Sequence, residues 1–268
     1  MRPELEAACL PYTLVLPGTP LRGLAGLRLG RGTGSSLEFQ EFRAYVPGDD
    51  LRHVDWRAYA RTDQLQVRQY REEIAPVVDL VADLSPSMAV TKAKASAARD
   101  LVEAFAFWAG VAGSRARRWC AAGEFADADQ AAFTDAADPA ALLRLPLRPR
   151  SLRVLLSDFL FPQDPARLIT ALAGQASGLW VVQLLDPWEQ APDAAAALTL
   201  VDAETGERRE IHLSERTRRG YLERLERLCQ GVEAAARTVA ASFARVVAAP
   251  PGALFRDQLL PQGLLAPA

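Results

Sequence analysis

Three side chains that bear hard oxygen atoms stand close together in the sequence DLSPS. Asp83, Ser85 and Ser87 occupy alternate positions at the end of the apolar stretch Val77–Asp83. Alternate residues of an extended segment point the same way, so one carboxylate and two hydroxyls can converge. Oxygen ligands of this kind suit Mg²⁺ or Mn²⁺ better than Zn²⁺. The stretch predicts a site for a divalent cation, and capping of the following helix is the alternative role for Asp83.

The elements that must position this site alternate between strand and helix. Three apolar stretches predict buried strands, and an aspartate ends or follows each of them: Val77–Asp83, Ser151–Ser157 before Asp158, and Gly178–Leu185 before Asp186. Helical patterns between them imply a mostly parallel sheet with helices on both faces. Right-handed crossovers then bring the strand ends to one edge of the sheet, where α/β proteins bind ligands. We expect Asp158 to join the site, whereas Asp186 is better explained as a strand stop before Pro187.

A site with one or two carboxylates leaves Mg²⁺ with net positive charge and an open coordination position. A carboxylate of a partner protein can fill that position, so the predicted chemistry is adhesion through a metal and not catalysis. A Mg²⁺-dependent phosphohydrolase is the enzymatic alternative, because strand-end aspartates with Mg²⁺ also serve phosphoryl transfer. Against it, position 85 is Ser, where the haloacid dehalogenase signature has a second Asp.

Composition and hydrophobic pattern divide the chain into three parts. Residues 1–76 contain Gly-rich turns and short alternating segments, which predict a small β-rich N-terminal subdomain. Residues 77–249 form the α/β domain, and residues 250–268 are punctuated by Pro and Gly and predict a C-terminal tail with one short helix around Leu254–Leu260. The further elements expected in the α/β domain are a helix from Thr91 to about Gly113, an edge strand at Ala131–Phe133, a hairpin around Glu204–Glu207, a long helix capped by Ser214, and a strand at Phe243–Val247.

Charge and cysteine usage argue against several classes of protein. The 31 basic and 33 acidic residues give a net charge of -2, which does not suit a protein that coats nucleic acid or an anionic membrane. Cys9, Cys120 and Cys229 are far apart, so they predict neither a disulfide framework nor a zinc site, and a reducing compartment fits. The two histidines, His53 and His212, stand alone and are not expected to be catalytic. Without a signal peptide or a long apolar run, we expect a cytoplasmic protein with no membrane span.

The stretch Asp83–Ser87 resembles the Asp-x-Ser-x-Ser signature of von Willebrand factor A domains. The apolar strand that ends at Ser157 and Asp158 resembles the strand that supplies the second Asp of those domains. The resemblance implies a Rossmann-type sheet with a metal-ion-dependent adhesion site, which also uses a Thr from an intermediate loop. Thr134 is the residue here that best matches this Thr, and a site without it would be weak or degenerate.

The block Gly30–Glu73 interleaves arginines, acidic residues and aromatics. Its runs YVPGDD and RHVDW, a following Ala-Arg pair, and then DLSPSM resemble, in this order, the family catalogued as domain of unknown function 58. That resemblance implies a partner of MoxR-type AAA+ ATPases in a chaperone-like or assembly role. It leads to the hypothesis of a non-enzymatic, metal-dependent protein-interaction module. A structural interaction protein with a degenerate metal site is a further alternative.

Three interpretations of the arginine-rich block remain open. A structural clamp, in which buried acidic groups pair with arginines and backbone amides, is favoured because buried charges need partners. A docking surface for acidic or aromatic groups is the second, and nucleotide or nucleic-acid contact is the third, although no nucleic acid is expected as a partner. The glycines of GRGTGSS are not followed by the Lys of a phosphate-binding loop. The residues assigned to the block are Asp49, Asp50, Arg52, Asp55, Trp56 and Arg61.

Overall fold

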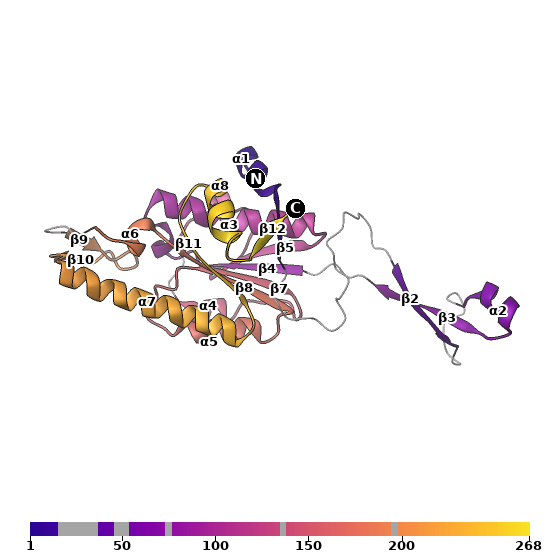
Figure 1. Ribbon diagram of the computed structural model, residues 1–268. Coiled ribbons are helices and arrows are strands. Elements are labelled where there is room, and N and C mark those ends of the chain that lie inside the picture. The colour runs from indigo at the N-terminus through magenta and orange to yellow at the C-terminus, as the bar shows by residue number, and fades with distance from the viewer. Residues whose placement is uncertain (16–36, 46–53, 73–76, 135–137, 194–197) are drawn as a thin grey trace. The chain divides into compact units, whose positions relative to one another are not determined.

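The computed structural model describes residues 1–15, 37–45, 54–72, 77–134, 138–193 and 198–268 (Figure 1). The chain forms two compact units, one made of residues 1–30 and 76–268 and the other of residues 31–75. These boundaries differ from the expected division at residues 76 and 249. The N-terminal segment and the C-terminal segment both belong to the larger unit, for reasons that their packing makes clear.

The larger unit is built on a six-stranded sheet in which one strand alone, β6, runs antiparallel to its neighbour. The strands, in spatial order, are β11 (Ser242–Val247), β8 (Gly178–Leu185), β7 (Leu152–Ser157), β4 (Val77–Ala82), β5 (Arg115–Cys120) and β6 (Gly123–Phe125). From β4 the chain crosses to β5 on one side, and from β7 it crosses to β8 on the other. The carboxyl ends of β4 and β7 therefore flank the point where the strand order reverses, which is where open α/β sheets bind ligands.

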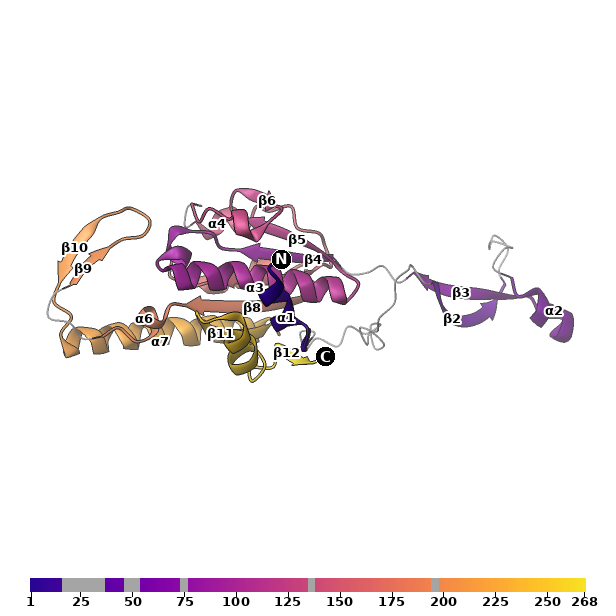
Figure 2. The same cartoon turned by 90° about the horizontal axis from the view of Figure 1, so that it is seen from above.

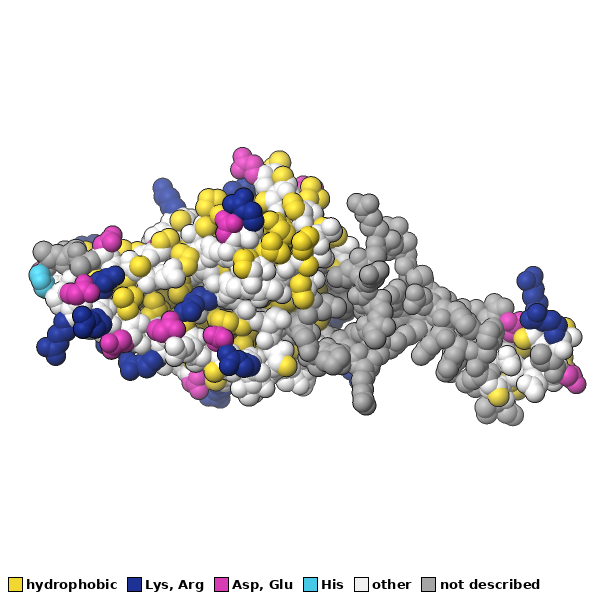
Figure 3. All heavy atoms as spheres, in the orientation of Figure 1, with side chains coloured by type: hydrophobic (Ala, Val, Ile, Leu, Met, Phe, Trp, Pro, Cys, Tyr) yellow, Lys and Arg dark blue, Asp and Glu magenta, His cyan; other side chains and the backbone are white. Residues whose placement is uncertain are grey.

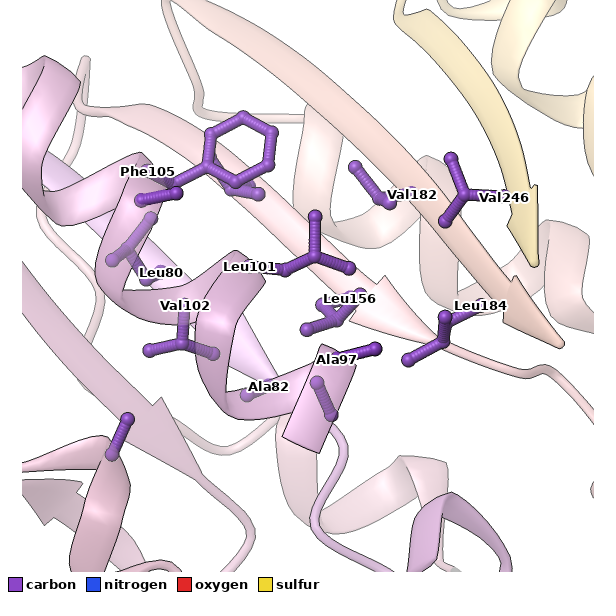
Figure 4. Close-up of a cluster of buried hydrophobic side chains, with 14 of the residues drawn as sticks. Leu80, Ala82, Ala97, Leu101, Val102, Phe105, Leu156, Val182, Leu184 and Val246 are labelled. Carbon is purple, nitrogen blue, oxygen red and sulfur yellow. The ribbon is translucent and has the colours of Figure 1, made fainter. Parts of the chain in front are cut away.

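Helices cover both faces of this sheet, as the sequence predicts (Figure 2). The long helix α3 (Lys92–Val111) lies on one face, where Leu101 and Phe105 meet strand residues such as Leu80 and Val182 (Figure 4). The other face is covered by α4 (Pro139–Leu142), α5 (Pro165–Ala173) and α7 (Glu215–Thr238). Because both faces of the sheet are covered, the central strands β4, β7 and β8 are mostly apolar instead of alternating, whereas β5 carries three arginines and is only partly buried.

Basic and acidic side chains alternate along the outer face of α7, so this part of the surface shows no large patch of one sign (Figure 3). Arg237 pairs with Glu233 one turn away at 2.8 Å, and Arg245 of the neighbouring strand pairs with Glu226 at 3.0 Å. Exposed pairs of this kind contribute little to stability, about 0.2–1 kcal/mol each. Among the described helices, none combines the length and the apolar character that crossing a lipid bilayer requires.

The two ends of the chain pack together on the α3 side of the sheet. After α1 (Pro3–Cys9), strand β1 (Tyr12–Leu14) pairs antiparallel with β12 (Leu265–Pro267). Between β11 and β12 the chain forms α8 (Pro251–Ala253) and a π-helical segment, Leu254–Leu259. The Phe255 side chain is completely buried, and its ring lies 5.0 Å from that of Trp108. The expectation of a C-terminal tail was therefore wrong, because residues 250–268 supply part of the core.

Two glutamines cover the free edge of β11. The Gln258 side chain accepts a hydrogen bond from the Val247 N–H at 2.7 Å and donates one to the Val247 carbonyl at 2.9 Å. Gln262 makes the same pair of bonds with Arg245, at 2.9 and 2.8 Å. Each amide thus takes the place that a residue of a neighbouring strand would occupy.

The smaller unit contains a two-stranded hairpin and one short helix. Strands β2 (Leu37–Ala44) and β3 (Gln66–Glu72) are antiparallel, and α2 (Trp56–Thr62) lies between them in sequence. Val54, Ala58 and Val67 are its buried apolar side chains among the described residues. A core this small agrees with the limited apolar content of the segment.

Two further predictions have different outcomes. The hairpin around Glu204 is present as β9 (Leu198–Val201) and β10 (Arg208–Ile211), after the short helix α6 (Pro187–Gln190). The edge strand expected at Ala131–Phe133 was wrong: this segment follows a 3-10 turn and is irregular. Phe133 has a positive φ of 49° and a buried ring beneath the Arg99 guanidinium, so burial, and not strand pairing, explains its apolar character.

Candidate functional site

The strand-end aspartates lie along one edge of the sheet. Asp83 follows β4 and Asp158 follows β7, which are hydrogen-bonded neighbours, and Asp186 follows the next strand, β8. The Asp83 N–H donates to the Leu156 carbonyl at 2.8 Å, so the ladder between β4 and β7 continues up to the site. Asp83 and Asp158 are both almost completely buried.

The DLSPS turn is held by its own polar groups. Asp83 Oδ1 accepts a hydrogen bond from the Ser85 N–H at 3.0 Å, and Oδ2 accepts one from the Ser157 hydroxyl at 2.7 Å. The hydroxyl oxygens of Ser85 and Ser87 are 2.9 Å apart. Thr91, and not Asp83, caps α3, because its side chain accepts the Lys94 N–H at 3.1 Å. Helix capping therefore does not account for Asp83.

A buried lysine neutralises part of this edge. Lys94 Nζ is completely buried and lies 2.8 Å from Asp158 Oδ2. The same ammonium donates to both carboxyl oxygens of Glu189, each at 2.8 Å. The other oxygen of Asp158 accepts the Leu160 N–H at 2.9 Å. Asp158 thus has an internal cationic partner, which the sequence pattern did not reveal, since a lysine in the first turn of a helix usually points to solvent.

Asp186 has a structural role, as its position before a proline predicts. It caps α6 by accepting the Trp188 N–H at 2.9 Å, and Glu189 completes a capping box by accepting the Asp186 N–H at 2.7 Å. Its second oxygen accepts a hydrogen bond from the Thr91 hydroxyl. These contacts link the beginnings of α3 and α6 and hold Lys94 and Glu189 together.

Thr134 is not brought to Asp83 by any contact within the described residues. It is exposed and follows the irregular segment that ends at Phe133. Asp138 lies closer: with Asp83 and Phe161 it lines a cavity of about 10 Å³, the space of roughly one water molecule. Asp138 also caps α4 by accepting the Ala140 N–H at 2.9 Å.

A carboxylate from the hairpin also reaches the site. The Ser87 N–H donates to Glu204 Oε1 at 3.3 Å, across 117 residues of sequence. Desolvation raises the pKa of Glu204, and the charges of Asp83 and Asp158 add to the shift. Burial likewise raises the pKa of Asp83, with a further contribution from Asp158. Burial raises the pKa of Glu189 too, although Lys94 opposes the shift. The edge therefore carries more negative than positive charge.

The raised pKa of Asp83 predicts a pH dependence of definite sign. A carboxyl group whose pKa is higher in the folded state than in the unfolded state, about 3.9, binds its proton more tightly when folded. The contribution of Asp83 to the free energy of unfolding is complete below the unfolded-state pKa. It is lost as the pH rises through the folded-state pKa. Without metal, the wild type should lose stability relative to Asp83→Asn as the pH rises, by at most about 1.4 kcal/mol per pH unit. Urea unfolding with a chelator at pH 4.5 to 8 measures this, and a constant difference would contradict it.

The residues at this edge fit a hard divalent cation. The hydroxyls of Ser85 and Ser87 are hydrogen-bonded to each other at 2.9 Å, a separation that two neighbouring oxygen ligands of an octahedral Mg²⁺ ion would also have, about 2.9 Å. Among the described residues, no lysine or arginine pairs with the buried Asp83. The described residues contain no cluster of three or more His, Cys, Asp or Glu residues that could hold a metal ion, so a cation here would need the serine hydroxyls as ligands beside the carboxylates. The side-chain oxygen of Gln183, whose nitrogen donates to the Asp158 carbonyl, is buried without a described partner.

The arginine-rich block is described only in part. Asp55 is buried and caps α2 by accepting the N–H groups of Arg57 and Ala58, each at 3.0 Å. Trp56 is 55 % exposed and Arg61 is also exposed. Asp49, Asp50, Arg52 and His53 lie outside the described residues. Asp55 thus pairs with backbone amides, which is one element of the clamp interpretation.

The strand order and the crossover helices define the class of protein: an α/β domain of von Willebrand factor A-like, Rossmann-type architecture. The chain belongs to the family described as "Protein of unknown function DUF58", whose profile matches residues 41–128 and 122–229. The resemblance of the arginine-rich block and DLSPSM to this family is thereby confirmed.

Similar proteins occur in mycobacteria. The uncharacterized proteins Mb1516 of Mycobacterium bovis and Rv1480 of Mycobacterium tuberculosis are each 29% identical over 237 residues, which cover 79% of this chain and 74% of theirs. Among solved structures, the conserved hypothetical protein BatB from Bacteroides thetaiotaomicron is similar over 65% of this chain and 91% of its own, with 12% identity and a TM-score of 0.35. With a score this low, the assignment of the fold depends on the strand order described above.

Proposed function

We propose that this protein is a non-enzymatic interaction module whose strand-end site binds Mg²⁺ or Mn²⁺. The bound ion then coordinates a carboxylate of a partner protein. The observation that carries the proposal is the pair of hydroxyls of Ser85 and Ser87, 2.9 Å apart, beside a buried Asp83 that lacks a described cationic partner. Buried carboxylates without a counter-charge are costly, and a bound cation removes that cost.

The roles of the residues follow from their hydrogen bonds. Asp83, Ser85 and Ser87 would bind the ion. Asp158 would bind it directly or through a water molecule, although its Oδ2 atom also contacts the Lys94 ammonium. Lys94 offsets part of the charge of Asp158 and Glu189, so fewer uncompensated carboxylates would face the ion. When bound, the metal supplies an open coordination position of the kind that an acidic side chain fills. Thr134 belongs to the ligand set only if its loop turns toward Asp83.

The partner we propose is a MoxR-type AAA+ ATPase, in a chaperone-like or assembly role. Support comes from membership of the DUF58 family, whose motifs in this chain imply such a partner. A co-purification experiment with the ATPase, with Mg²⁺ and with chelator, tests this part separately from metal binding. If the ATPase co-purifies to the same extent with chelator and with Asp83→Ala, binding does not depend on the metal and this part of the proposal is wrong.

Metal binding should stabilise the wild type but not Asp83→Ala. A ligand at 100 times its dissociation constant raises the free energy of unfolding by about 2.7 kcal/mol, because it binds the folded state alone. Thermal-shift and calorimetric titration with Mg²⁺ and Mn²⁺ measure the effect. Asp164→Ala is the matched control: it removes an exposed aspartate that only caps α5, so it should keep the metal-linked shift. A wild type without metal-linked stabilisation would refute the metal site.

A specific observation favours the second candidate, an interaction protein with a degenerate metal site. The ammonium of Lys94 already lies on Asp158, so the chain provides an internal cation at the edge where a metal is expected. In that case the Asp83 turn is a structural element, and titration with Mg²⁺ or Mn²⁺ gives no shift. A phosphohydrolase has less support, because Ser85 bonds to Ser87 where a general acid or base is needed. Turnover of an aryl phosphate that Asp83→Asn abolishes would favour the enzyme.

A further inference from the structure

The β9–β10 hairpin is attached to the rest of its unit in an unusual way. Every residue from 199 to 210 is exposed, and the strands pair only with each other. Among the described residues, a single hydrogen bond joins this hairpin to the remainder of the unit, from the Ser87 N–H to Glu204 Oε1 at 3.3 Å. The hairpin turn bends back over the end of the sheet where α3 begins (Figure 2).

The turn is shaped to present Glu204. Asp202 Oδ1 accepts the N–H groups of Glu204 and Thr205, at 3.0 and 2.7 Å, and Gly206 has a positive φ of 72°. These contacts give the tip a defined form that does not depend on the rest of the protein. A two-stranded hairpin that buries so little is only marginally stable in water by itself. Its position over the site therefore depends on the contact that Glu204 makes.

The negative charge of the strand-end site opposes the approach of Glu204 unless a cation is bound there. Glu204 approaches an edge that already holds the carboxylates of Asp83 and Asp158, and Lys94 is committed to Asp158 and Glu189. Carboxylates that approach one another repel, whereas a cation between them converts the repulsion into attraction. The hairpin has an exposed apolar pair, Leu200 and Val201, which does not hold it in place.

We propose that the β9–β10 hairpin is a lid over the strand-end site, latched by Glu204 when a divalent cation is bound. This inference rests on the proposed function, because the latch needs the same ion. In the closed state Glu204 contributes the carboxylate that a partner would otherwise provide, and the protein is autoinhibited. An acidic side chain of the partner must displace Glu204, and the lid then opens.

Hydrogen exchange of the full chain tests the latch. Amide exchange measured by mass spectrometry, with Mg²⁺ and with chelator, should show slower exchange with Mg²⁺ in residues 198–211 of the wild type, by several-fold. Glu204→Gln should abolish this protection and weaken Mg²⁺ binding in calorimetry by roughly 10-fold. The matched control is Glu207→Gln, which removes an exposed glutamate of the same turn that pairs with Arg209, and it should behave as the wild type.

The outcomes separate the lid from the metal site. If Mg²⁺ binds the wild type in a way that depends on Asp83, but the hairpin exchange does not respond, the lid is wrong and the metal site stands. The same holds if Glu204→Gln binds Mg²⁺ with unchanged affinity and keeps the protection. A wild type that binds no Mg²⁺ overturns the lid together with the proposed function.

Discussion

Replacing Lys94 with methionine is expected to lower the free energy of unfolding by about 3–5 kcal/mol, because it leaves buried carboxylates without their counter-charge. Asp158 and Glu189 both contact the Lys94 ammonium at 2.8 Å, and the lysine side chain is completely buried. Methionine has a similar length, so the lost charge and not a lost volume dominates the effect. Urea unfolding in the presence of a chelator measures it.

Lys92 offers the matched control for this experiment. It lies in the same first turn of α3 but is exposed, so Lys92→Met should change stability by no more than about 0.5 kcal/mol. Adding Asp158→Asn to Lys94→Met should recover part of the loss, since it removes one of the two stranded charges. A Lys94→Met protein as stable as the wild type would show that the ammonium is not the cation that holds this edge.

Phe255→Ala is expected to cost about 3–5 kcal/mol of unfolding free energy, the range for emptying a buried aromatic position. The Phe255 ring is completely buried against Trp108, whose indole N–H also donates to the Cys9 carbonyl at 3.0 Å. Leu10→Ala provides the comparison, because Leu10 is 61% exposed and its truncation should have little effect. Urea unfolding followed by circular dichroism distinguishes the two. A loss below about 1 kcal/mol for Phe255→Ala would mean that the C-terminal segment is not part of the core.

The sheet could be predicted from the sequence because its strands are buried on both faces. A mostly apolar stretch such as Leu152–Ser157, which Arg153 interrupts, is typical of a buried parallel strand when helical patterns stand on either side of it. The shared edge of Asp83 and Asp158 follows from the handedness of crossovers, which is a general rule and needs no side-chain detail. The fold and the positions of the strand ends could therefore be predicted from the pattern of residues.

The partners of those aspartates could not be predicted in the same way. Lys94 and Glu189 meet because α3 and α6 begin side by side, and their separation of 95 residues carries no local signal. Glu204 reaches Ser87 only through the path of a hairpin whose strands carry no core residues. The short helix expected around Leu254–Leu260 is present, but its packing into the core could not be predicted, because Pro and Gly interrupt the pattern on both sides of it. The buried Leu254 and Leu259 lie on a π-helical turn, whose spacing differs from that of an α-helix.

The two glutamines that cover β11 have a consequence for how copies of this protein can associate. An uncovered edge strand invites a second chain to continue the sheet, which leads to dimers, captured peptides or fibrils. The side chains of Gln258 and Gln262 already bond the backbone groups of β11 that an incoming strand would use. A second chain therefore cannot continue the sheet there. At the opposite end of the sheet, the last strand, β6, has only three residues. A second chain would therefore find no open edge at β11 of the six-stranded sheet and only three residues to pair with at β6.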